Sequence, residues 1–154
     1  MREILFRGKR TDNGEWIYGD LMQNVDCIKI REQEKDVKHI AKSFEIDLET
    51  VGQYTELADK NGKRIWEGDI VRYTFDSPDD PTATENGLKV RTGRIFWSDW
   101  RASFAVTAGR NLSEALNNDV AVYVRGRQVY EYVRGANTVE VIGNITDNTE
   151  LLEK

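Results

Sequence analysis

The chain has very few of the residues that commonly build metal sites and nucleophilic centres. Its 154 residues include one cysteine, Cys27, and one histidine, His39. An intramolecular disulfide is therefore excluded, as is a cysteine-rich or two-histidine metal site. A thiol nucleophile with its base would need both residues, and no nucleophile motif surrounds Cys27. We interpret Cys27 as a small buried hydrophobe and His39 as solvent-exposed, and we expect no metal and no cofactor.

Long apolar runs and phosphate-binding glycine motifs are also missing. No segment approaches the roughly 20 apolar residues that cross a membrane, and the start of the chain has no signal-peptide core, so we expect a cytoplasmic protein. Neither a dinucleotide-binding nor a P-loop glycine pattern occurs. The 22 basic residues are outnumbered by 27 acidic ones, giving a formal charge of −5. This balance disfavours a protein that mainly grips phosphate backbones.

Proline is confined to one segment. The chain has only two prolines, Pro78 and Pro81, and they lie among Asp, Ser and Thr residues. This composition blocks both a helix and a central strand. We therefore predict a single domain over residues 1–154 with a flexible insertion loop at about 76–88.

Turn signals between β-forming runs are abundant instead. Asn-Gly pairs at 13–14 and 61–62 each predict a hairpin, the first joining strands at 4–7 and 16–21. A second turn at Glu67-Gly68-Asp69 leads into a strand at 70–75. The remaining predicted elements are strands at 27–30, 43–48, 89–97 (with a bend at Gly93), 103–106 and 139–145, a hairpin of 120–124 with 129–133 turning at 125–127, short helices at 113–117 and 149–152, and an exposed charged tip at 31–38.

These elements predict a mainly β fold. We expect a strongly bent antiparallel sheet or SH3-like barrel core from residues 49–75 and about 90–106, with added hairpins and one or two short helices. Four residues, Asn61, Gly62, Gly68 and Asp69, form the structural signature of its turns. We expect the Asp69 carboxylate to accept hydrogen bonds from turn amides.

The central stretch resembles a known family. Gln53-Tyr54-Thr55, the segment 59–63 and Glu67-Gly68-Asp69-Ile70-Val71 are similar to the signature of the YopX family. The segments 6–9, 14–20, 47–53 and 139–145 resemble that family's two ends. The resemblance implies a protein of phages or prophages of Gram-positive bacteria. It brings no established activity and no functional residues.

The chain departs from the family's usual residues at four positions. Glu56 stands where Gly is usual, Leu48 and Thr149 stand where Pro is usual, and Trp66 often replaces a Tyr. All four concern turn chemistry and packing. We expect the terminal helix that begins at Thr149 to fray, because Thr does not preset φ as Pro does.

Two groups of residues are candidates for chemistry. Glu67 and Asp69 flank Gly68 and would form an acid–base pair if they converged, although structural roles in the turn are the favoured interpretation. The second group interleaves aromatic residues with arginines. Three alternatives stay open for it: a core face with a solvated face, a protein interface, or a surface for single strands. Its members are Arg91, Arg94, Phe96, Trp97, Trp100, Arg101 and Phe104. The candidate binding residues among them are Arg94, Phe96, Trp97, Trp100 and Arg101.

The leading hypothesis is a small phage or prophage accessory protein that acts by binding a protein partner or a second copy of itself. The alternative is a small-barrel module that binds nucleic acid, which the acidic net charge disfavours. A carboxylate-based hydrolase is the remote alternative, and we do not expect an enzyme.

Overall fold

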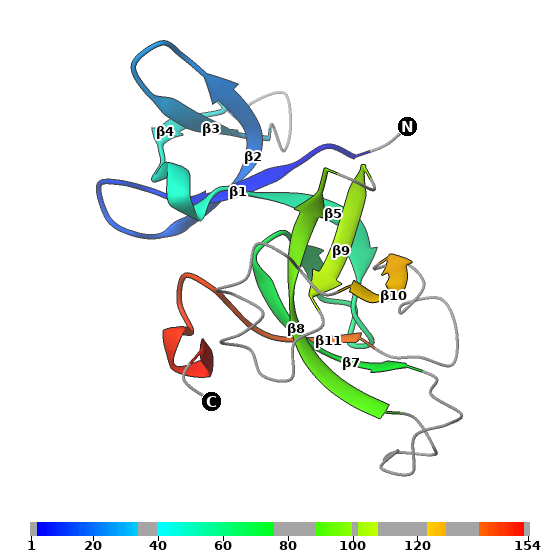
Figure 1. Ribbon diagram of the computed structural model, residues 1–154. Helices are drawn as coiled ribbons and strands as arrows, with labels where there is room; N and C mark the ends of the chain where they lie inside the picture. Colours follow the sequence, from blue (N-terminus) through cyan, green and yellow to red (C-terminus); the bar gives the residue numbers. More distant parts are fainter. Residues whose placement is uncertain are drawn as a thin grey trace. The chain divides into compact units, whose positions relative to one another are not determined.

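The computed structural model describes residues 3–33, 40–75, 89–99, 102–107, 123–128 and 139–152. The chain divides into two compact units, Met1–Glu56 and Leu57–Lys154. Two antiparallel sheets account for most of the described residues (Figure 1). The helices within the described ranges are two short 3₁₀ turns, η1 (Leu48–Thr50) and η2 (Thr149–Leu152). None of the described helices is long and apolar enough to span a membrane.

The first sheet has the strand order β4-β3-β2-β1-β5-β6, and β5 continues from the first unit into the second. Its strands are β1 (Phe6–Lys9), β2 (Trp16–Gln23), β3 (Ile28–Glu32), β4 (Ser43–Glu45), β5 (Gly52–Ala58) and β6 (Arg64–Trp66).

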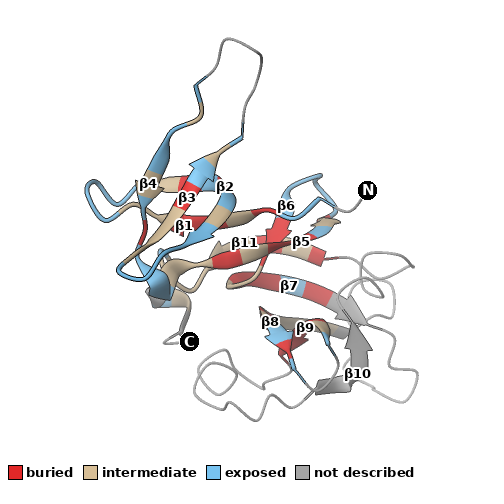
Figure 2. Ribbon diagram, turned by 90° about the horizontal axis from the view of Figure 1, so that it is seen from above, coloured by how far each residue is buried: buried red, intermediate tan, exposed pale blue. Residues whose placement is uncertain are grey.

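The first unit curls so that the chain after β1 meets the chain after β4. Arg10 and Ile46 form an isolated antiparallel bridge, and the Asp47 amide donates to the Lys9 carbonyl at 2.8 Å. The curl encloses a small core of Ile17, Ile30 and Ile46. Burial alternates along β2, as a sheet with one apolar face requires (Figure 2).

The second sheet has the order β10-β9-β8-β7-β11. Its strands are β7 (Asp69–Phe75), β8 (Lys89–Ser98), β9 (Ser103–Thr107), β10 (Tyr123–Gln128) and β11 (Val139–Asn144). Its core is larger than that of the first unit. The buried members are Ile65, Val71, Tyr73, Ile95, Phe104, Val106, Val139 and Val141.

Strand β8 changes neighbours in its middle. It pairs with β7 up to Arg94 and with β9 from Ile95 onward. A Cβ atom at Gly93 would clash with the Thr107 carbonyl oxygen, so the change of partner requires glycine there. The predicted bend at Gly93 falls at this point.

The mainly β prediction is confirmed, and so are the two Asn-Gly turns. Gly14 and Gly62 have φ of 71° and 79°, the conformation that such turns need. Gly68, in the next turn, has φ of 83°. The predicted strands at 16–21, 70–75, 89–97, 103–106 and 139–145 correspond to β2, β7, β8, β9 and β11. The SH3-like barrel stays a prediction.

Three predictions are wrong. The turn at 125–127 does not exist, because these residues lie inside β10, which pairs with β9. The register shifts between Tyr123 and Gln128, so the Arg-Gly-Arg sequence sits within an irregular strand instead of reversing the chain. The strand predicted at 43–48 ends at Glu45, because Asp47 caps η1 by accepting a hydrogen bond from the Glu49 amide. The start of the tip predicted at 31–38 is wrong, because Arg31 and Glu32 belong to β3.

Several predictions lie outside the described residues. They are the insertion loop at 76–88, residues 34–38 of the charged tip with His39, and the helix at 113–117.

Candidate binding surfaces

Asp69 is a structural residue of the turn between β6 and β7. Its side chain is 2% exposed, and its Oδ2 accepts a hydrogen bond from the Trp66 amide at 2.8 Å. The predicted role as an acceptor for turn amides is therefore confirmed. An acid–base pair with Glu67 would require this carboxylate to reach a substrate, and its burial opposes that use.

Asp59 does more for the fold than the sequence analysis predicted. Its Oδ1 accepts hydrogen bonds from the amides of Asn61 at 2.8 Å and Lys63 at 2.9 Å, which fixes the β5–β6 turn. Its Oδ2 accepts from the Val141 amide at 3.0 Å, which ties that turn to β11. Burial alone would raise the pKa of Asp59, but the three amide donors together outweigh it and hold the pKa below its usual value. The Asp-x-Asn-Gly sequence signals the local part of this network, whereas the bond to Val141 depends on the tertiary fold.

The arginine-aromatic group on β8 is divided between the two faces of the strand. Trp97 lies on the same face as the core residue Ile95, where it packs edge-on against Phe104 with ring centroids 5.1 Å apart. Its side chain is nevertheless 39% exposed. Arg94 and Phe96 are half-buried and alternate with these residues, so they face the other way. Trp100 and Arg101 lie outside the described residues.

A second arginine-aromatic group lies on the first sheet, and the sequence analysis did not identify it. Ile17 of β2 and Ile30 of β3 point into the core, so their neighbours along each strand project from the opposite face. We call this surface the aromatic-basic face. Its residues are Arg7, Lys9, Trp16, Tyr18, Lys29 and Arg31.

Cross-strand register places the members of the aromatic-basic face side by side. Lys9 lies opposite Trp16, and Arg7 lies opposite Tyr18. The Arg7 guanidinium carbon is 4.9 Å and the Lys9 Nζ is 5.5 Å from the centre of the Trp16 ring. These are cation–π distances, and they hold the indole in place. Tyr18 is 47% exposed. The alternation in Trp16-Ile17-Tyr18 and Lys29-Ile30-Arg31 is the sequence signal for this face.

An open, polar hollow of about 440 Å³ adjoins the same face. It is lined by Asp20, Arg31, Glu32 and Gln33. Asp20 follows Tyr18 by two residues on β2 and lies directly opposite Arg31 of β3. The hollow therefore offers two carboxylates, Asp20 and Glu32, and one guanidinium, Arg31, near an exposed aromatic ring.

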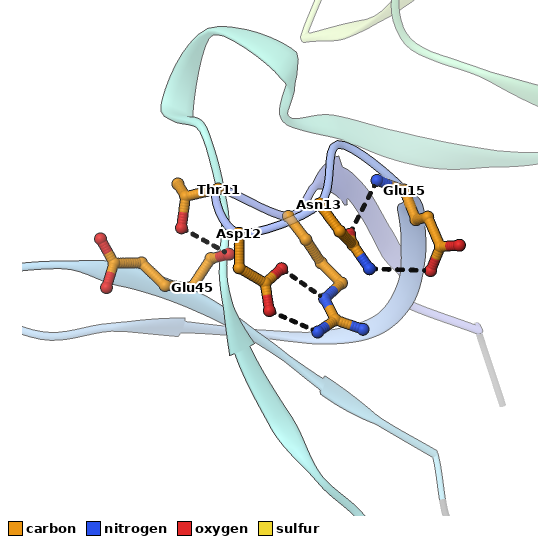
Figure 3. A network of polar contacts seen from close by, with 6 residues as sticks. Thr11, Asp12, Asn13, Glu15 and Glu45 are labelled. Carbon is orange, nitrogen blue, oxygen red and sulfur yellow. Dashed lines mark hydrogen bonds and ion pairs between the residues drawn. The ribbon is translucent and has the colours of Figure 1, made fainter.

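The turn between β1 and β2 is rich in charge but is internally paired (Figure 3). The Arg10 Nε donates to Asp12 at 2.9 Å, and Asn13 donates to Glu15 at 3.0 Å. The hydrogen bond from Arg10 lowers the pKa of the Asp12 carboxyl. The Thr11 amide donates to the Glu45 carbonyl at 3.1 Å and so connects this turn to β4. In the part of the chain that the structure describes, no three His, Cys, Asp or Glu side chains are grouped to hold a metal.

Together these features define a small, mainly β protein of two antiparallel sheets with arginine-aromatic surfaces. The family model described as YopX protein matches residues 5–153. The chain therefore belongs to the YopX family, as the sequence resemblance implied.

One solved structure can be compared along nearly the whole chain. It is the crystal structure of protein EF1440 from Enterococcus faecalis. The alignment covers 99% of this chain and 99% of that chain, with 22% sequence identity and a TM-score of 0.49. No curated protein matches the sequence.

Proposed function

We propose that this YopX-family chain is a small accessory protein of a phage or prophage, working in the host cytoplasm. It acts by binding a protein partner or a second copy of itself, and not by catalysis. The observation that carries this proposal is the partly exposed Trp97 at the end of β8.

Trp97 combines two properties of an interface anchor. Its edge-on contact with Phe104 fixes the ring, while 39% of the side chain stays exposed. A large ring held in place loses little conformational entropy on binding, and tryptophan is enriched among the residues that dominate binding energy. The two buried carboxylates of the second unit support binding over catalysis, because Asp59 and Asp69 accept hydrogen bonds from backbone amides and so have structural roles.

The proposal includes an SH3-like barrel core built from residues 49–75 and about 90–106. Its support is β8, which pairs with β7 along one half and with β9 along the other, as a strongly bent strand of a small barrel does. Small barrels commonly leave one rim of loops and strand ends for partners, and Trp97 lies next to the β8–β9 turn.

Light scattering behind size exclusion, over a range of protein concentrations, tests self-association. We expect a defined oligomer that Trp97→Ala converts to monomer. Leu48→Ala is the matched control, because Leu48 is a large exposed hydrophobe of the first unit, 64% accessible. It should leave the oligomer unchanged.

A wild-type chain that is monomeric at every concentration would exclude the second copy as the partner. Photo-crosslinking from position 97 in phage-induced host cells would then test the protein partner, with position 48 as control. A crosslinked species common to both positions, or found at neither, would contradict the proposal.

A further inference from the structure

We propose that the aromatic-basic face of the first unit binds single-stranded nucleic acid. This goes beyond the proposed function, because it uses a different surface in a different unit. The face combines two aromatic rings on one strand with cations on the strands to either side.

The aromatic rings lie on the central strand of the three. Trp16 and Tyr18 are two residues apart on β2 and project from the same face. Two residues of a strand span about 6.7 Å. Aromatic side chains on the open face of a sheet are a common platform on which proteins stack unpaired bases.

The cations lie on both flanks of this platform. Lys9 comes from β1, while Lys29 and Arg31 come from β3, where they lie opposite Met22 and Asp20. Arg7 of β1 is 7% exposed, so its part is to hold the Trp16 ring and not to meet a phosphate. On strands β1 to β4, two carboxylates project from this face, Asp20 and Glu45, against three exposed or half-buried cations, Lys9, Lys29 and Arg31. The strands of this face thus carry one more positive than negative charge in a chain whose net charge is −5, and the three cations are placed to contact phosphates.

The ring spacing favours a single strand over a duplex. The 6.7 Å step is about twice the 3.4 Å rise between stacked bases of a duplex strand. Bases that stack on Trp16 and Tyr18 must therefore be drawn apart from each other, which an unpaired strand permits and a duplex resists. A double helix would meet only the cations.

The hollow beside Tyr18 supplies groups that suit a base edge or a phosphate. Asp20 is exposed and can accept a hydrogen bond from an exocyclic amine, as carboxylates do from cytosine. Arg31, from the opposite wall, can donate to a phosphate or to a base carbonyl.

The test is fluorescence anisotropy of the full-length protein with a labelled mixed-sequence 20-mer of single-stranded DNA, and with the same sequence as a duplex. We expect saturable binding of the single strand and weaker binding of the duplex. Tyr18→Ala should weaken single-strand binding about 10-fold, within the range found for losing one stacked base. Tyr18→Phe keeps the ring and should bind as the wild type does.

The cations are tested through salt. Lys29→Gln should lower the slope of log affinity against log salt by about 0.7, which is one phosphate contact to a single strand. Arg72→Gln is the matched control, because Arg72 is an exposed cation on β7 of the second unit, and it should leave the slope unchanged. Trp97→Ala should also leave it unchanged, so failure of this inference and failure of the proposed function are distinguishable.

Three outcomes would overturn the inference. They are no binding at 50 mM salt, binding that Tyr18→Ala and Lys29→Gln both leave intact, and equal affinity for single strand and duplex. Polyglutamate of equal charge is the competitor. If it displaces the oligonucleotide, and if Tyr18→Ala does not weaken oligonucleotide binding, the face would be assigned to an acidic polypeptide instead.

Discussion

The two units use their polar residues in opposite ways. In the second unit, two carboxylates are buried and accept hydrogen bonds from turn amides. Asp59 accepts in the turn of the β5–β6 hairpin, and Asp69 accepts in the turn that precedes β7. In the first unit, the carboxylates of the β1–β2 turn are exposed, and two cations of β1, the buried Arg7 and the half-buried Lys9, lie over the Trp16 ring.

The cores differ in the same direction. Three residues are buried in the core cluster of the first unit and eight in that of the second. A larger core and buried hydrogen bonds raise the free energy needed to open a unit, so the first unit, with its smaller core, should open more readily than the second. In the two proposals above, the second unit is mainly a folded scaffold with one aromatic anchor, and the first provides the wider binding surface.

Core truncation in each unit gives the largest expected effect and tests this contrast directly. Ile95→Ala, at a site that is 1% exposed, should lower the free energy of unfolding by about 4 kcal/mol. Ile30→Ala, at a site that is 0% exposed, should lower it by about 3 kcal/mol. Both values include the transfer of the side chain and the cavity left behind, and the smaller core has more room to collapse. Urea unfolding measures the totals.

Hydrogen exchange separates the two units in these variants. Ile30→Ala should accelerate exchange in β1 to β4 and leave β7, β8 and β11 protected. Uniform acceleration of exchange across both sheets would show that the two units unfold together. The units would then not differ in stability, which would contradict the contrast between them.

Removing the Asp59 carboxylate should have the next largest effect. Asp59→Ala should cost about 3 kcal/mol, because hydrogen bonds to a charged acceptor are lost and the buried Val141 amide is left without one. Asp59→Asn should lower the free energy of unfolding by about 2 kcal/mol, since its one remaining side-chain oxygen still accepts from the Asn61 and Lys63 amides. A loss below 1 kcal/mol in urea unfolding of Asp59→Ala would show that water replaces the carboxylate and that the network contributes little.

Acid should weaken the same network. The pKa of Asp59 is lower in the folded chain than the usual value of about 4 in an unfolded one, so folding favours the ionised form. Its stabilisation is complete above about pH 5 and is lost as the pH falls through 4 toward the folded pKa. Asp12 and Glu140 also have lowered pKa values and contribute in the same direction. The part due to Asp59 is the difference in pH dependence between wild type and Asp59→Asn, measured by urea unfolding from pH 3 to pH 7.

Local chemistry made much of the second unit's framework predictable. Gly62 and Gly68 have the positive φ that their turns need, the Asn61 amide donates to Asp59 in its turn, and Asp69 accepts from the Trp66 amide as expected. The bond from Val141 to Asp59 was not predictable, because it joins residues 82 positions apart. The Arg-Gly-Arg segment of β10 was mistaken for a turn because glycine marks both turns and irregular strands, and the pairing with β9 decides between them.

The candidate surfaces show a similar limit. Trp97 was identified because aromatic residues and arginines are close together in the sequence around it. The aromatic-basic face was missed because its members come from three strands, and only the register brings Arg7 beside Tyr18 and Arg31 beside Asp20. Sequence proximity also grouped Arg94 and Phe96 with Trp97, although strand alternation directs them to opposite faces.

Glu56 offers a smaller effect at the end of the first unit. It has φ of 66°, a conformation that costs a residue with a side chain about 1 kcal/mol and costs glycine little. This agrees with the glycine that the family resemblance places there. Its Oε1 accepts from the Glu3 amide at 2.7 Å, an exposed bond that substitution would remove. Glu56→Gly should therefore be more stable in urea than Glu56→Ala, which loses the bond and keeps the strain, by about 1 kcal/mol. Equal stability of the two variants would show that the positive φ carries no strain.

Leu48→Pro gives the smallest expected effect and also tests the family resemblance. Leu48 is the first residue of η1, where an amide has no partner within the helix, and Asp47 before it has ψ of 118°, which a following proline favours. The variant should gain about 0.5 kcal/mol, because proline restricts the unfolded chain without straining the folded one. Leu48→Ala separates this gain from loss of the exposed side chain. Because η1 belongs to the first unit, the gain should appear as slower hydrogen exchange in β1 to β4; a gain confined to the second sheet would contradict the assignment of separate stabilities to the two units.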